Sequence, residues 1–112
     1  MTAERTKQKV MNVVIVDGFA MQRATIKNDL EAMQEFVGGW IETASMGDGY
    51  IVVCNEEGML LGLPQNIIGV YGKCFICRID EINDGEMRGL TNEEMTYVMQ
   101  RISEDLLLGG EE

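Results

Sequence analysis

The stretch that decides the fold reads Asn55-Glu56-Glu57-Gly58-Met59-Leu60-Leu61-Gly62-Leu63-Pro64-Gln65-Asn66. Apolar runs flank its turn residues: Tyr50 to Cys54 enters the turn and Met59 to Leu63 leaves it, which predicts a β-hairpin. We expect Gly58 to take the left-handed conformation that a three-residue hairpin loop needs. Pro64, the only proline in the chain, should end the returning strand because it has no backbone N–H to donate.

Short apolar runs separated by glycine-containing turns predict the other strands. The expected strands are Asn12–Val16, Gln22–Ile26, Trp40–Ala44, Tyr50–Asn55, Leu60–Leu63 and Val70–Asp80. Turns are expected between them at Asp17-Gly18, Gly47-Asp48-Gly49 and Asn83-Asp84-Gly85.

Two segments have helical periodicity. In the first, Asn28 is the expected N-cap, Glu31 would complete a capping box, and Gly38-Gly39 should end the helix. In the second, Thr91 and Glu94 form the capping box, and Gly109-Gly110 should end the helix. Leu90 and Met95 are placed to pack as a hydrophobic staple beside that box. The apolar faces, with spacings of three and four, are Leu30, Met33, Phe36 and Val37 in the first helix and Met95, Val98, Met99, Ile102 and Leu106 in the second.

This order of elements, ββαβββ(β)α, predicts an α+β fold. We expect a mainly antiparallel sheet of about five or six strands, with both helices packed on one side of it. The expected organisation is a flexible polar tail over residues 1–9, one domain over 10–108 and an acidic tail over 109–112. Leu106, Leu107 and Leu108 cannot all face one core from a single helix, so we expect at least one to be exposed or to contact another subunit, as in a homodimer.

The charge is strongly negative and unevenly distributed. The chain of 112 residues has a net charge of −10. Residues 1–27 hold five Lys/Arg and two acids, whereas residues 28–112 hold four Lys/Arg and seventeen acids. Such a body repels nucleic acid and anionic membranes and favours a basic partner. No apolar run is long enough to cross a bilayer, and the start of the chain is polar, so we expect a cytoplasmic protein.

The chain has no histidine, the commonest general base and a common zinc ligand. Its three cysteines are Cys54, Cys74 and Cys77. Cys74 and Cys77 match a C-x-x-C pattern, but residues three apart in a strand point to opposite faces. We therefore expect two core thiols rather than a redox or metal site, and we expect no cofactor.

With these residues laid out, the chain resembles the family of small domains of unknown function numbered 3846, which implies a phage or other mobile element. The resemblance covers about residues 10 to 107. Ile67 follows the loop asparagine, where the family often has a basic residue, and Ile67–Tyr71 is more apolar than expected. The matching pieces are Val13–Val16, the helix end Leu30–Gly39, Trp40-Ile41-Glu42, Asn55–Gly58, Gly62-Leu63-Pro64-x-Asn66 and Leu90-Thr91-x-Glu93.

These residues argue against an enzyme. Adjacent carboxylates such as Glu56 and Glu57 point apart on a tight turn, and no phosphate-binding or dinucleotide motif is present. The favoured function is counter-defence, in which the protein inhibits a host immune protein whose basic cleft handles nucleic acid. The acids expected to form the contact face are Asp29, Glu31, Glu35, Glu56, Glu57, Glu86, Glu93 and Glu94.

Two other functions stay open: a sponge that sequesters a nucleotide immune signal near residues 62–66, and a structural or regulatory subunit. In the sponge, asparagines could read base edges, aromatic rings could stack, and Arg78 or Arg88 could meet a phosphate. Residues 62–66 could also be turn chemistry alone. The candidate binding residues are Asn55, Glu56, Glu57, Gly62, Leu63, Pro64, Gln65, Asn66, Trp40, Tyr50, Tyr71 and Arg78.

Overall fold

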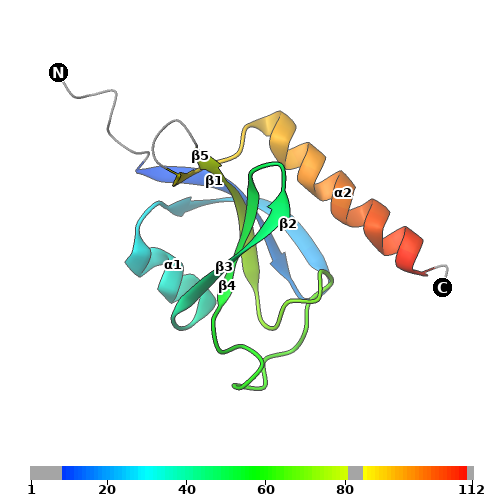
Figure 1. Cartoon of the computed structure of the whole chain (residues 1–112), viewed down its shortest axis with the longest axis horizontal. Helices are drawn as coiled ribbons and strands as arrows, with labels where there is room; N and C mark the ends of the chain where they lie inside the picture. Colours follow the sequence, from blue (N-terminus) through cyan, green and yellow to red (C-terminus); the bar gives the residue numbers. More distant parts are fainter. Residues whose placement is uncertain (1–8, 81–84, 111–112) are drawn as a thin grey trace.

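The structure, a computed structural model, describes residues 9–80 and 85–110, with side chains as far as Asp105. Its elements are β1 (Val10–Asp17), β2 (Ala20–Lys27), α1 (Leu30–Val37), β3 (Ile41–Gly47), β4 (Tyr50–Asn55), β5 (Cys74–Asp80), β6 (Glu86–Arg88) and α2 (Asn92–Gly110) (Figure 1). The expected α+β order is confirmed. Most of the expected N-terminal tail, the turn residues Asn83 and Asp84, the side chains of the leucine triplet and the last two acids lie outside the described residues.

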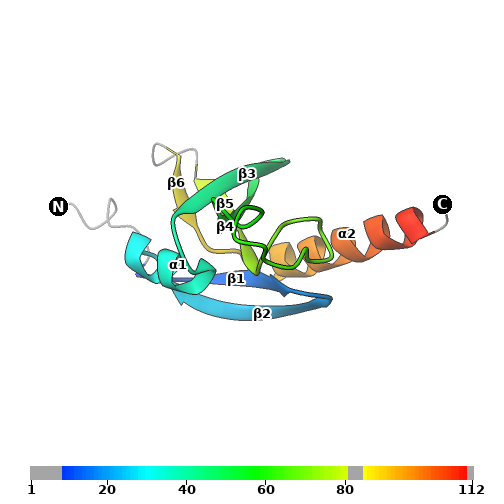
Figure 2. The ribbon, with the colours of Figure 1, turned by 90° about the horizontal axis from the view of Figure 1, so that it is seen from below.

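The sheet has six strands, all paired antiparallel: five follow the order β2-β1-β5-β4-β3, and the sixth, β6, pairs with β5. The central strand, β5, pairs with β4 along one side. Its other side pairs first with β1, where Cys74 lies opposite Val16, and then with β6, where Asp80 lies opposite Glu86. Figure 2 shows β3 lying far from β1 and β2, with β4 and β5 between them.

The hairpin predicted after β4 is wrong. Residues Met59–Leu63 form no strand; their chain coils, and the amides of Leu61 and Leu63 donate to the carbonyls of Glu57 and Gly58 at 2.9 and 3.0 Å. Gly58 has no positive φ either. The sixth strand of the sheet is the short β6 rather than the expected Leu60–Leu63. The strand β5 begins at Cys74 rather than Val70, because residues 70–73 belong to the loop before it.

The helices lie on opposite faces of the sheet, not on one side as expected (Figure 1). Alternate residues of β5 divide between two cores, so Cys74 and Ile76 pack on the α2 face, while Phe75 and Cys77 pack on the α1 face. The prediction that Cys74 and Cys77 are core thiols facing apart is confirmed. A strand that is buried on both faces has a continuous apolar sequence with no polar alternation. Its sequence therefore gives no sign that one helix packs on each face.

The caps of α1 were only partly predicted. Asp29, not Asn28, is the N-cap, and its carboxylate accepts a hydrogen bond from the amide of Ala32 at 2.7 Å. Asn28 is buried instead, and its side chain donates to the carbonyl of Met87. Gly38 takes the left-handed C-terminal conformation as predicted, with φ of 85°. Leu30 opens the helix and stays exposed, so it does not share the buried face.

The capping box of α2 is confirmed. The Thr91 amide donates to the Glu94 carboxylate at 2.9 Å, and the Glu94 amide donates to the Thr91 hydroxyl at 3.1 Å. Leu90 and Met95 are buried in one core with Val98 and Ile102. The helix continues through Gly109 and Gly110, which were expected to end it.

Candidate functional site

The loop of residues 56–73, between β4 and β5, holds most of the predicted binding residues, and Asn66 organises it. The buried side chain of Asn66 donates to the carbonyl of Gly72 at 2.9 Å. Its oxygen accepts from the amides of Ile68 and Val70 at 2.9 and 3.1 Å. Asn66 therefore bonds three main-chain groups of its own loop, and its amide has no edge left to read a base.

Asn55 has the equivalent role at the start of the loop. It is buried, and its side chain donates to the carbonyl of Val37 at the end of α1 at 3.1 Å. Its oxygen accepts from the amide of Glu57 at 2.7 Å. Asn55 thus fastens the loop to α1, and its amide is also committed to the fold.

Close packing holds the two arms of the loop together. Gly58 is buried, and a Cβ at this position would collide with the carbonyl oxygen of Tyr71. Gly72, with φ of 92°, lies against the side chain of Leu63 and donates to the carbonyl of Pro64 at 2.8 Å. Glycine is needed at both positions, at Gly58 for close approach and at Gly72 for its backbone conformation as well.

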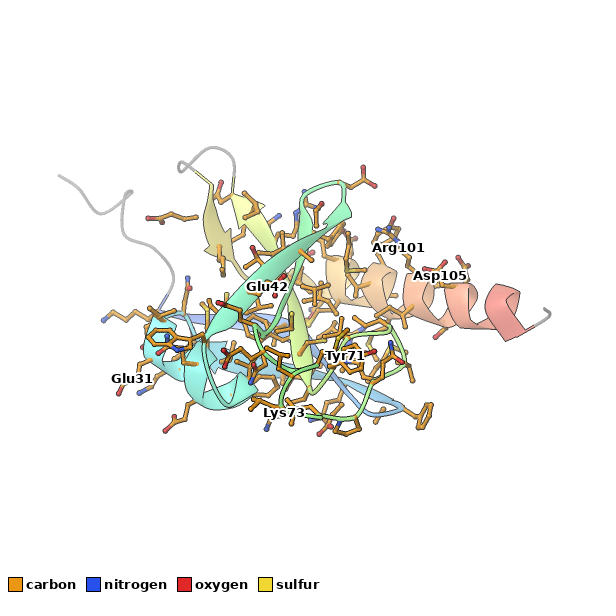
Figure 3. The ribbon with its side chains drawn as sticks, turned by 60° about the horizontal axis from the view of Figure 1, so that its bottom comes forward. Glu31, Glu42, Tyr71, Lys73, Arg101 and Asp105 are labelled. Carbon is orange, nitrogen blue, oxygen red and sulfur yellow. The ribbon has the colours of Figure 1, made fainter. Side chains whose placement is uncertain are left out.

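The other predicted residues do not converge on a single site. Trp40 is exposed before β3, and its carbonyl accepts from the amide of Glu56 at 2.8 Å. Tyr50 and Arg78 come from neighbouring strands and contact each other, with the guanidinium 4.5 Å from the ring centroid. Gln65 and Tyr71 form an isolated bridge within the loop. Figure 3 labels Tyr71 and Lys73 in the loop, and the Lys73 ammonium lies 4.6 Å from the ring centroid of Phe36 in α1.

Arg78 belongs to an ionic cluster at the start of α2. Glu94 accepts two hydrogen bonds from Arg88, at 3.0 and 2.9 Å, and also lies 3.5 Å from Arg78. The hydrogen bonds from Arg88, foremost, and from the backbone of Thr91 lower the pKa of Glu94 to about 2. Both guanidinium groups thus have a carboxylate partner, which weakens the prediction that either one meets a phosphate.

The sequence analysis missed a groove on the α2 face of the sheet, with a volume of about 510 Å³. Its polar side chains include Arg101 and Asp105, which Figure 3 shows on α2, and the Arg101 guanidinium donates to the carbonyl of Met46. None of the predicted binding residues lines it. The unusually apolar run after Asn66 was the available signal. The lining residues are Ala44, Ser45, Met46, Val52, Ile67, Ile68, Val70, Arg101, Ile102 and Asp105.

The thiols offer no reactive centre in the part of the chain that the structure describes. Burial raises the pKa of both Cys74 and Cys77 to about 12, so neither is a thiolate near neutral pH. Burial, with a smaller effect from Glu42, also raises the pKa of Cys54. Within the described residues, no group of three or more acidic or cysteine side chains is arranged to hold a metal ion.

The surface is more acidic than the composition alone implies, because three of the four described arginines turn inward. Arg78, Arg88 and Arg101 are only partly exposed and bind groups of the protein itself. The exposed basic residues in the described part of the chain are Lys9, Arg23, Lys27 and Lys73. The exposed acids there are Asp17, Asp29, Glu31, Glu35, Glu42, Asp48, Glu56, Glu57, Glu86, Glu93, Glu104 and Asp105.

The family described as Domain of unknown function (DUF3846) matches residues 11–103, which span β1 to most of α2. The chain belongs to this family. The DUF3846 match covers both cores, the loop of residues 56–73 and the ionic cluster. No curated protein and no solved structure matches the chain significantly. None of the helices described in this DUF3846 domain is long and apolar enough to span a membrane.

Proposed function

We propose that this DUF3846 protein is a non-enzymatic binding protein whose acidic surface engages a basic partner protein. The observation that carries the proposal is the surface charge: exposed acids outnumber exposed bases among the described residues, and three arginines bind the protein itself. Attraction between opposite charges accelerates association with a basic partner, whereas an acidic surface repels nucleic acid and other anionic partners.

The setting that we propose is a phage or other mobile element acting against its bacterial host. A host defence protein that cleaves or binds nucleic acid must have a basic cleft, because phosphate contacts dominate such binding. An acidic protein that occupies the cleft would exclude the nucleic acid and inhibit the defence protein. The cytoplasm of the host cell is the compartment that this function requires.

The groove of about 510 Å³ has a volume in the range of small-molecule sites and is the main argument for a nucleotide sponge. Its charged side chains do not suit a nucleotide. Arg101 donates to the carbonyl of Met46, and Asp105 would repel a phosphate. Asn55 and Asn66, the predicted base readers, are buried with their amides bonded internally. We therefore favour a protein partner.

The test is affinity capture from bacterial lysate, followed by titration of the purified partner at increasing salt. Raising ionic strength from about 0.1 M to about 1 M shortens the Debye length from about 10 Å to about 3 Å. The association rate should then fall at least about tenfold. An affinity that stays flat across this range would contradict the proposal.

A matched pair of variants separates specific charge from bulk charge. Glu31→Gln/Glu35→Gln removes two exposed acids from α1, and Glu104→Gln/Asp105→Asn removes two from α2. Both pairs change the net charge equally. Unequal losses of association rate identify the contacting face. In a separate thermal-shift titration, a rise in melting temperature with cyclic dinucleotides or cyclic trinucleotides would support the sponge instead.

A further inference from the structure

The loop of residues 56–73 has three consecutive apolar side chains in solvent at its turn. Met59, Leu60 and Leu61 are 66%, 84% and 58% exposed. We call these three residues the loop tip. Single exposed apolar residues are normal on protein surfaces, but a contiguous exposed group indicates a contact site. The other large exposed apolar residues in the described chain are Val10, Phe19, Leu30, Trp40 and Tyr97.

The loop tip is held in place by its own backbone. The Leu61 amide donates to the carbonyl of Glu57 at 2.9 Å, and the Gly62 amide donates to the carbonyl of Met59 at 3.1 Å. Beneath the tip, Gly58 packs against Tyr71, and Asn55 fastens the chain to α1. A loop that is already ordered loses little conformational entropy on binding, so its apolar contacts contribute more fully to affinity.

Charge beside the loop tip points to one kind of partner. Glu56 and Glu57 are exposed and directly precede Gly58. An anionic membrane would repel these two carboxylates, and a second copy docked tip to tip would place like charges together. A basic protein surface would attract them.

We propose that the loop tip is the apolar anchor of the partner-binding surface. It would insert into an apolar pocket framed by lysine or arginine side chains, which pair with Glu56 and Glu57. This inference rests on the proposed function and adds the place of contact and the chemistry of the partner's pocket. Buried apolar anchors surrounded by a charged rim are the usual arrangement of protein interfaces.

The chain has a natural reporter for docking at this place. Trp40 is its only tryptophan, is 67% exposed, and bonds through its carbonyl to the amide of Glu56 at the base of the loop. Covering a solvent-exposed indole shifts its fluorescence emission to shorter wavelength. A partner seated on the loop should therefore change the emission of the unlabelled protein.

The test selects binders from a library of short random peptides displayed against the whole protein. The expected peptides combine aliphatic or aromatic residues with lysine or arginine and shift the Trp40 emission. Leu60→Ser should weaken their binding about thirtyfold, the loss expected of an interface hot spot. Phe19→Ser is the matched control, because Phe19 is 90% exposed on the β1–β2 turn, and it should leave binding unchanged. Equal binding by wild type and Leu60→Ser would overturn the inference.

The two proposals can fail separately. If Leu60→Ser has no effect while binding of the basic peptides falls with salt, the docking place is wrong and the proposed function stands. If selected peptides carry no basic residues and bind equally at all salt concentrations, the proposed function fails. Sedimentation of wild type and Leu60→Ser, and flotation with phosphatidylglycerol vesicles, cover the other occupants. A dimer that Leu60→Ser dissociates, or vesicle binding that it abolishes, would overturn the inference.

Discussion

Replacing Asn66 with alanine should destabilise the protein by about 3 kcal/mol. The Asn66 side chain bonds the amides of Ile68 and Val70 and the carbonyl of Gly72, at 2.9, 3.1 and 2.9 Å. Each bond contributes about 1 kcal/mol net, and alanine restores none of them. Domains of this size are stable by about 5–15 kcal/mol, so the variant should still fold.

The control is the neighbouring residue. Gln65 is exposed, and its side chain has one bond, to the carbonyl of Gly69 at 3.0 Å. Gln65→Ala should therefore cost less than about 0.5 kcal/mol. Urea unfolding measures both variants, and Asn66→Ala should lower the midpoint while leaving the slope unchanged. If the two variants unfold at the same midpoint, Asn66 does not organise the loop and our account of the site is wrong.

Three further predictions concern other parts of the molecule. The pKa of Glu94 is about 2 in the folded protein against 4.5 ordinarily, so the ionised Glu94 should stabilise the fold fully above about pH 4.5 and progressively less as the pH falls toward about 2. In urea unfolding at a series of pH values, the stability of Glu94→Gln should lack this pH dependence. Gly58→Ala should destabilise by about 2 kcal/mol or more, measured by the same unfolding assay, since its methyl group displaces a backbone carbonyl. In native protein a thiol reagent should modify only Cys54, and slowly, whereas Cys74 and Cys77 should react only after unfolding; mass spectrometry of the labelled protein counts the modified thiols.

The features of the fold that depend on a few neighbouring residues were predicted correctly from the sequence. The capping box of Thr91 and Glu94 and the left-handed Gly38 were identified because each depends on a few neighbouring residues. Asn28 was mistaken for a cap because its side chain bonds Met87, which is distant in sequence. The facing of the helices failed for a similar reason: β5 is buried on both sides, so its apolar run carries no alternation.

The sequence located the loop of the candidate site but did not predict its conformation or its contacts. Residues 56–66 do belong to a loop held by internal hydrogen bonds, yet the apolar run Met59–Leu63 was interpreted as a strand because nothing in the sequence shows that it lacks a pairing partner. Asn55 and Asn66 were candidate ligand contacts, and their hydrogen bonds depend on main-chain groups that only folding brings close. The groove joins β3, β4, the loop and α2, and pattern analysis of one segment cannot find such a place.

The alternation along β5, like that along β1 and β4, makes the middle of the sheet a wall common to two separate interiors. A change of volume at Phe75 acts on the α1 side, and one at Ile76 acts on the α2 side, although the two residues are adjacent. Either helix could loosen while the opposite interior keeps its packing. Amide hydrogens of β5, the central strand, would then exchange last with solvent, since this strand is released only when both interiors have opened.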